Sequence, residues 1–181
     1  MSIAEQRVEE CLRLAFANVT RPNDDELFLA KITDFKPHLT SDTRDSIAQF
    51  VGRRWQELDL DAIVKYCLPT LTFTPLGAWY YCPAIVIARM SRSYYGSLDE
   101  FVHKFVSSDV SAWAPSEWRE SRKECRDFFN VHQTWAMLKF FNLVTQNSES
   151  RKYKSLYPYL NSKSETFKFF SKLPSRRQLE L

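Results

Sequence analysis

Glycine is scarce in this chain: only Gly52, Gly77 and Gly96 occur among its 181 residues. Hairpin turns and phosphate-binding loops depend on glycine, because it adopts positive φ and lets the backbone approach a ligand closely. Three scattered glycines form neither GxGxxG nor GxxxxGK[ST]. The sequence therefore excludes nucleotide binding through those two motifs.

Motifs for metal binding and nucleophilic catalysis are also missing. The cysteines have no CxxC spacing, the histidines form no HExxH, and no GxSxG occurs. Asp24-Asp25-Glu26 and Asp59-x-Asp61 lie at expected helix starts, where the helix dipole favours negative charge. Cys82 lies among apolar residues in mid-helix, without the basic neighbours that a reactive thiolate needs. We expect no catalytic residue, metal or cofactor, and expect the cysteines to be reduced core thiols.

No apolar run is long enough for a membrane span. The longest, Leu76–Met90, has 15 residues, whereas a transmembrane helix needs about 20. The N-terminus, MSIAEQRVEECLRL, is charged and lacks the apolar region of a signal peptide. These patterns predict a cytoplasmic protein that does not enter a membrane.

The chain does contain ample core material, with 14 Phe, 8 Tyr and 5 Trp. Apolar residues recur at helical spacing, and strand signals are confined to the short stretch 71–73. We predict an all-α, compact, single-domain bundle of about seven to nine helices over residues 1–150. The expected helices lie near 3–18, from 24 to before Pro37, from 41 to 55, at 59–68, at 75–90, from 98 to 106, at 116–129 and from 131 onward. Capping boxes are expected at Ser2/Glu5, Ser97/Glu100 and Asn130/Gln133.

The helix at 75–90 is predicted to be the buried centre of the fold. Thr74 supplies a capping hydroxyl and Pro75 occupies the first helical position, where its missing N–H costs nothing. Pro83, in the interior, is expected to kink the helix. Tyr80 and Tyr81 point about 100° apart on a helix. Either both tie the helix to its neighbours through their hydroxyls, or one of them lines a binding cleft.

Two stretches of the sequence share a pattern with known proteins. Within residues 70–88, LTFTPLGAWYYCPAIVIA carries TP and YYxPA at fixed spacing, and residues 128–144 read FFNVHQTWAMLKFFNLV. The first resembles the TPxAxxYYLPA-type motif of an uncharacterised bacterial family, a domain of unknown function, and the second resembles a later part of that family. Cys82 replaces the usual leucine, and Leu76-Gly77 replaces a more polar pair. The resemblance covers about residues 45–145, implies no established activity, and matches these positions: Thr74, Pro75, Ala78, Tyr80, Tyr81, Pro83, Ala84, Phe129, Gln133 and Phe141.

The C-terminal segment 151–181 has a different character. Residues 150–181 hold eight Lys or Arg against two acids, whereas the rest of the chain is mildly acidic. Aromatic residues lie among these basic side chains, so part of the segment is expected to dock on the helical domain. Basic and aromatic side chains together also suit nucleic acid, which is one alternative.

The absence of catalytic motifs favours a protein that acts by binding another protein. A bacterial immunity or inhibitor protein, which neutralises a toxin or effector stoichiometrically, is the specific hypothesis. An enzyme with an unrecognised site is a further alternative. Exposed aromatic and basic side chains commonly anchor interfaces. The predicted contact residues are Tyr94, Tyr95, Trp113, Trp118, Lys152, Lys154, Arg176 and Arg177.

Overall fold

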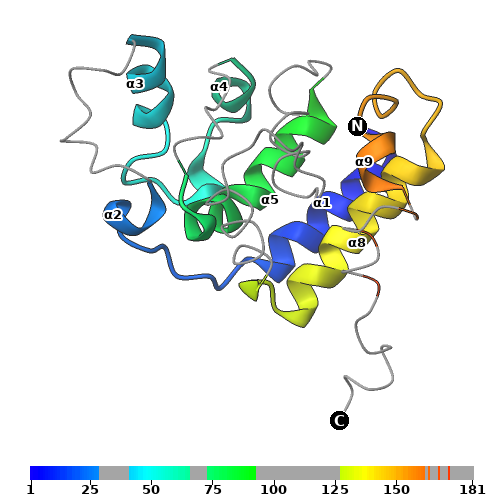
Figure 1. The fold of residues 1–181 in the computed structure, drawn as a ribbon, viewed down its shortest axis with the longest axis horizontal. Helices are drawn as coiled ribbons and strands as arrows, with labels where there is room; N and C mark the ends of the chain where they lie inside the picture. The colour runs from blue at the N-terminus through cyan, green and yellow to red at the C-terminus, as the bar shows by residue number, and fades with distance from the viewer. Residues whose placement is uncertain are drawn as a thin grey trace.

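The computed structural model describes residues 1–28, 41–65, 73–92 and 127–161, together with Lys163, Phe167 and Ser171. Within these residues the chain is mostly helical and forms no strand; one isolated antiparallel bridge joins Phe28 to Phe73. The elements are α1 (Ile3–Ala15), α2 (Asp24–Leu27), α3 (Ser41–Ala48), the 3-10 turn η1 (Trp55–Glu57), α4 (Leu60–Lys65), α5 (Pro75–Ser91), α8 (Val131–Gln146) and α9 (Tyr157–Leu160) (Figure 1).

The predicted predominance of helix is therefore confirmed, while the predicted number of helices stays a prediction. The helix expected from 98 to 106 and most of the one at 116–129 lie outside the described residues. The capping boxes at Ser2/Glu5 and Asn130/Gln133 are confirmed, since both begin helices as predicted.

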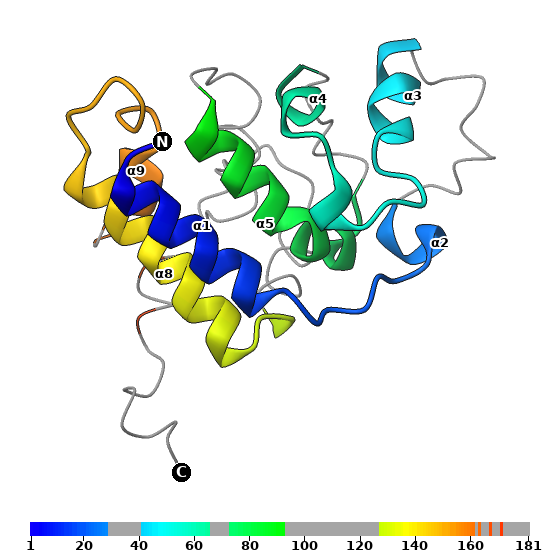
Figure 2. The same cartoon turned by 180° about the vertical axis from the view of Figure 1, so that it is seen from behind.

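Helix α5 is the centre of the described structure. It contacts α1, α2, α4 and η1, and every residue from Tyr80 to Met90 is buried. α1 packs along α8, and α8 contacts α9. The two opposite views place α1, α8 and α9 on one side of α5, and α2, α3 and α4 on the other (Figures 1 and 2).

The start of α5 is held against α2. The Thr74 hydroxyl accepts from the Gly77 N–H at 3.0 Å and donates to the Glu26 carbonyl at 2.5 Å. The Thr74 N–H donates to the Leu27 carbonyl at 3.0 Å. The predicted Thr-Pro helix start is confirmed. Pro83 lies inside the helix, which continues through it to Ser91, and the expected kink stays a prediction.

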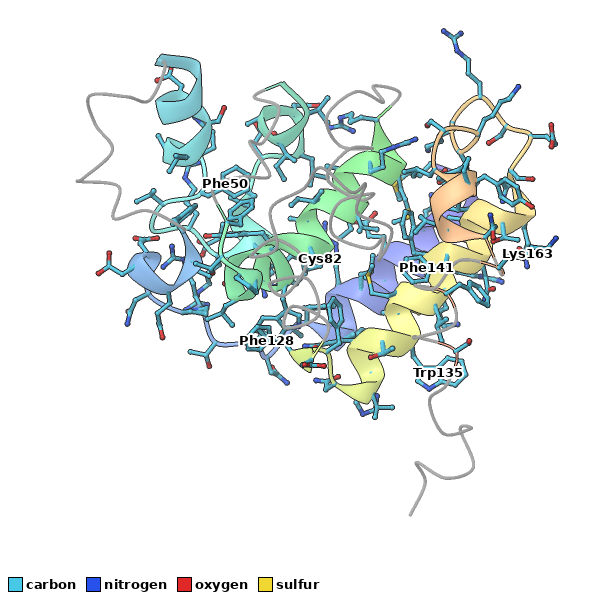
Figure 3. The ribbon with its side chains drawn as sticks, in the orientation of Figure 1. Phe50, Cys82, Phe128, Trp135, Phe141 and Lys163 are labelled. Carbon is cyan, nitrogen blue, oxygen red and sulfur yellow. The ribbon has the colours of Figure 1, made fainter. Side chains whose placement is uncertain are left out.

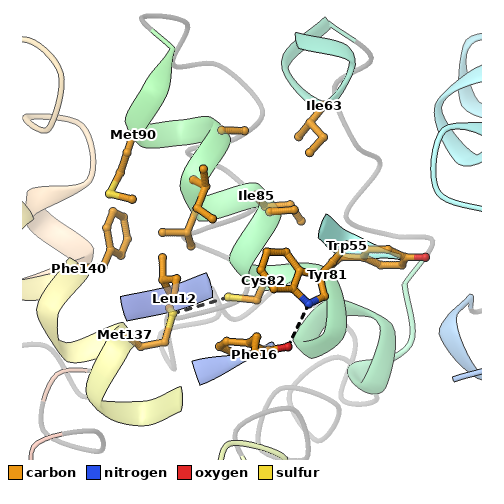
Figure 4. Packing of buried hydrophobic residues seen from close by; sticks show 14 of the residues in the cluster. Leu12, Phe16, Trp55, Ile63, Tyr81, Cys82, Ile85, Met90, Met137 and Phe140 are labelled. Atoms are coloured by element: carbon orange, nitrogen blue, oxygen red, sulfur yellow. Dashed lines mark hydrogen bonds between the residues drawn. The ribbon is translucent and has the colours of Figure 1, made fainter. Parts of the chain in front are cut away.

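Aromatic and sulfur-containing side chains fill the core between α1, α5 and α8 (Figure 4). The Phe16 ring lies 6.4 Å from Trp55, 6.1 Å from Trp79 and 6.1 Å from Phe129, measured between centroids. The Cys82 thiol faces the Met137 sulfur at 3.8 Å. Burial raises the pKa of the Cys82 thiol, as expected for a core residue.

Three local predictions need correction. The first helix ends at Ala15 rather than near 18, because 3-10 hydrogen bonds such as Ala17 N–H to the Leu14 carbonyl close the last turn. The second is a single turn ending at Leu27, since Phe28 is extended and bridges Phe73. The third helix ends at Ala48 rather than continuing to 55, and Val51, in the turn that follows, is 38% exposed.

The structure also places part of the C-terminal segment in the core. Tyr153, Leu156 and Leu160 are 3%, 0% and 0% exposed and belong to the same apolar cluster as α5. Phe167 packs against that cluster. Residues 150–160 are thus continuous with the helical domain. Among the helices of the described residues, none has the length and apolar character to cross a membrane.

Candidate interaction surface

Two of the predicted contact residues lie in the described part of the chain. The Lys152 ammonium binds the Glu5 carboxylate at 2.5 Å, and its side chain is 24% exposed. Lys154 is exposed. The remaining predicted contact residues, Tyr94, Tyr95, Trp113, Trp118, Arg176 and Arg177, lie outside the described residues.

Glu5 is the centre of a polar cluster that joins the N-terminus to the segment after α8. Its Oε1 accepts from Lys152 and from the Tyr153 hydroxyl, each at 2.5 Å, and its Oε2 accepts from the Ser2 N–H at 2.6 Å. Burial raises the pKa of Glu5, but the hydrogen bonds from Lys152, Tyr153 and Ser2 outweigh it. The pKa therefore lies below its usual value, and the group is a saturated acceptor rather than a free base.

Arg89 connects this cluster to α5. Its side chain is fully buried, its Nη2 donates to the Lys152 carbonyl, and its guanidinium carbon lies 5.8 Å from the centre of the Tyr153 ring. Lys152 lies over the same ring at 5.7 Å. Two cations thus lie within about 6 Å of the centre of the Tyr153 ring, and the Glu5 carboxylate pairs with one of them, Lys152.

A second polar cluster surrounds Tyr81. Its hydroxyl donates to the carbonyls of Phe50 at 2.9 Å and Arg53 at 3.2 Å, and lies 3.5 Å from the Arg21 guanidinium. Arg21 also pairs with Asp24. Burial raises the pKa of Tyr81 to about 12, although Arg21 acts to lower it. The hydroxyl stays protonated at neutral pH and links α5 to the turn after α3.

Tyr80 is buried as well, with an exposed fraction of 0%. Burial raises its pKa, against smaller lowering effects of the Trp55 backbone and of Arg21. Both tyrosines are 0% exposed, which favours the interpretation in which they tie α5 to its neighbours. The hydrogen-bonding interpretation holds for Tyr81.

Members of the predicted acidic pairs are bound by neighbouring side chains and backbone. Asp24 pairs with Arg21 and accepts from the Gly52 N–H, and Asp61 pairs with Arg92. Within the residues that the structure describes, no group of three or more His, Cys, Asp or Glu side chains is placed to hold a metal. The polar clusters of the interior act as cross-links between segments, and the candidate for recognition must be sought on the surface.

The outward face of α8 has the chemistry of a recognition surface. The exposed residues of this helix recur at spacings of three and four and form one stripe: His132, Trp135, Lys139, Asn142 and Gln146. Trp135 is 37% exposed and is the single large apolar side chain in that stripe. In Figure 3 it projects outward from α8, away from Cys82 and Phe141. We call these five residues the α8 stripe.

The helix that carries this stripe is firmly held. The Asn130 side chain accepts from the Gln133 N–H at 2.9 Å, and Gln133 Oε1 accepts from the Asn130 N–H at 3.1 Å. The same Gln133 oxygen accepts from Trp79 Nε1 at 3.2 Å, which ties the cap to α5. Phe128, 42% exposed, stacks on Trp79 beside this cap. The stripe is thus displayed on a preorganised support.

Trp135 is a large apolar residue at helical spacing with other apolar residues of α8, and that spacing alone does not show that it is exposed. A signal was present in the sequence, because His132, Lys139, Asn142 and Gln146 define a polar face at helical spacing. Trp135 falls inside that face. A tryptophan whose neighbours on the helical wheel are polar indicates an exposed binding residue, whereas one whose neighbours are apolar indicates a core residue.

No family model, curated protein or solved structure matches this chain. The resemblance of Thr74–Ala84 to an uncharacterised bacterial family therefore stays a prediction. The proposed function therefore depends on the chemistry and exposure of this chain's own residues.

Proposed function

We propose that the protein acts by stoichiometric binding of another protein, and that the α8 stripe forms part of the contact. The observation that carries this proposal is Trp135, an indole exposed within a polar helix face, between His132 and Lys139. Tryptophan is strongly enriched among the residues that dominate binding energy, because it buries a large area with few rotatable bonds.

The neighbours of Trp135 suit the same role. His132, Lys139 and Asn142 supply donors and acceptors around the indole. Protein interfaces commonly surround an apolar anchor with a polar rim of this kind. The support given by the Asn130/Gln133 cap means that little conformational freedom is lost when a partner binds.

The specific form that we propose is a bacterial immunity or inhibitor protein, which would neutralise a toxin or effector by binding it. Such a protein needs a rigid body and a recognition surface rather than catalytic groups. The bacterial family resemblance at residues 74–84 is compatible with this form. A toxin or secreted-effector gene beside the coding gene would support it, whereas a position inside a metabolic operon would contradict it.

The binding test begins with a tagged full-length chain purified from its native host, followed by mass spectrometry and measurement of the dissociation constant with the purified partner. Trp135→Ala is expected to weaken binding by about 30-fold or more, which corresponds to about 2 kcal/mol. Val51→Ala is the matched control, because Val51 has nearly the same exposure, 38%, on a different part of the surface. If Trp135→Ala and wild type bound the partner equally well, the α8 stripe would not be part of the contact.

The nucleic-acid alternative needs a more careful experiment than removal of the whole basic segment. Deleting residues 150–181 would remove Tyr153, Leu156 and Leu160 from the core and unfold the protein. Charge removal at Arg151, Lys154 and Lys163, all exposed, leaves the core intact. Nucleic-acid binding that weakened with each removed charge, and with added salt, would favour this alternative.

A further inference from the structure

The outward face of α1 holds the two most exposed large apolar side chains in the described part of the chain. Ile3 is 69% exposed and Leu14 is 71% exposed. Eleven residues separate them, which is about three helical turns, so both side chains lie on one face of the helix. The opposite face carries Val8 and Leu12, which are buried in the core.

Two opposite charges lie between these apolar residues on the same face. Arg7 and Glu10 are exposed and follow Ile3 by four and seven positions, so the face reads apolar, basic, acidic, apolar. We call Ile3, Arg7, Glu10 and Leu14 the α1 stripe. No ion pair of Arg7 or Glu10 occurs within the described residues, whereas Glu9 and Arg13 beside them bond each other at 2.8 Å.

The order of the four residues is self-complementary. When a second copy of α1 lies antiparallel across the first, about a two-fold axis through the helix centre, Ile3 meets Leu14 and Arg7 meets Glu10. Each contact then occurs twice, as in any interface between identical surfaces related by a two-fold axis. A parallel arrangement would instead set like charges opposite each other.

We propose that the α1 stripe is a two-fold contact between two copies of this chain. In Figure 2 α1 lies in front of α8, with α5 beside it, and all four residues of the α1 stripe are exposed, so a second helix can approach them. One face of a 13-residue helix is small compared with the roughly 800 Å² per partner of a stable interface. The contact is therefore weak, with a dissociation constant on the order of 100 µM.

Sedimentation velocity of the full-length protein from about 10 µM to about 1 mM tests the proposal. Wild type is expected to pass from monomer to dimer over this range, and added salt is expected to weaken the dimer. A chain that stays monomeric throughout would overturn the proposal, as would a dimer that is insensitive to every change in the α1 stripe.

Charge reversal tests the pairing directly. Arg7→Glu and Glu10→Arg each set like charges opposite one another twice per dimer, and each is expected to weaken association at least tenfold. The double variant R7E/E10R restores both pairs and is expected to restore association. Lys154→Glu and Glu149→Arg are matched controls, because they make the same charge changes at exposed positions outside the stripe.

Sedimentation velocity also measures how much the apolar residues of the α1 stripe contribute to association. Glutamine has a helix propensity similar to that of leucine, and Leu14 is 71% exposed, so Leu14→Gln should leave the circular dichroism spectrum unchanged. Because it removes an apolar side chain from the α1 stripe, it should weaken association. Failure of the double variant to restore association would refute the antiparallel register. Since the α1 stripe and the α8 stripe share no residue, either proposal can fail while the other stands.

Discussion

Gly77 lies in the first turn of α5, against the backbone of Leu27, and its replacement by alanine is a sharp test of how α5 is seated. A Cβ at this position would overlap the Leu27 carbonyl oxygen and would lie 2.9 Å from its carbonyl carbon and 3.1 Å from its Cα. Leu27 cannot withdraw freely, because its carbonyl accepts from the Thr74 N–H at 3.0 Å and its side chain is 0% exposed.

The expected loss of stability follows from three contributions. In an open helix, replacing glycine by alanine would stabilise the protein by about 1 kcal/mol. At Gly77, forcing a methyl group into occupied space costs roughly 1–3 kcal/mol. Moving the Leu27 carbonyl away breaks its bond to Thr74 and leaves a poorly satisfied polar group, which costs about 1–3 kcal/mol more. Together these terms predict that Gly77→Ala lowers the free energy of unfolding by about 1–5 kcal/mol.

Urea unfolding, followed by tryptophan fluorescence and circular dichroism, measures this loss. Gly52→Ala is the control, since Gly52 has φ of +70° but a Cβ there would meet nothing within 4 Å. Only the backbone strain, about 1–2 kcal/mol, opposes that change, and Gly52→Asn should recover part of it. If Gly77→Ala proved neutral or stabilising, α5 could not approach Leu27 as described.

Three further predictions concern the buried polar groups. The pKa of Glu5 is lowered in the folded state, so its contribution to stability is present above about pH 4.3 and is lost as the pH falls through the folded pKa. Thermal unfolding between neutral and acid pH should therefore show a steeper loss for wild type than for Glu5→Gln, and equal slopes would contradict the cluster around Glu5. Tyr81→Phe should lower the free energy of unfolding by about 1 kcal/mol, because the Phe50 and Arg53 carbonyls each lose one donor but keep the Arg53 N–H and the Arg21 Nε respectively; an unchanged free energy of unfolding would contradict these two hydrogen bonds. The Cys82 thiol should resist alkylation in the native protein and react once the chain is unfolded in urea, and rapid native labelling at Cys82 would show that the core is open there.

The helix starts were predictable from sequence because their interactions are local. The Ser2/Glu5 and Asn130/Gln133 capping boxes and the Thr74 cap each join residues three positions apart. A local hydrogen bond needs only the right residues at the right spacing, so the pattern carries nearly all of the information. Helix ends were less predictable, since the end of α2 depends on a bridge between Phe28 and Phe73.

The polar clusters could not be predicted, because their members are distant in sequence. Glu5 and Lys152 are 147 positions apart, and Tyr81 is 31 positions from Phe50. Lys152 reads as one of several basic residues in a basic segment, and nothing in its neighbourhood marks it as the partner of a buried carboxylate. Composition changes near residue 150, yet Tyr153, Leu156 and Leu160 belong to the core, so composition alone did not say which residues of the C-terminal segment pack against the helical domain.

The tryptophans Trp55 and Trp135 differ in exposure although both lie at helical spacing in the sequence. Both are large apolar residues within segments predicted to be helical, yet Trp55 is 2% exposed and Trp135 is 37% exposed. Trp135 shares an exposed helix face with His132, three positions before it, and Lys139, four positions after it, and both are polar. Ile3 and Leu14 on α1 follow the same pattern: both are exposed, and the charged residues Arg7 and Glu10 lie between them on the same face. On a helix whose inner face is already apolar, a large apolar residue in the outer, charged face adds nothing to the core. It is there that binding surfaces should be sought in this chain.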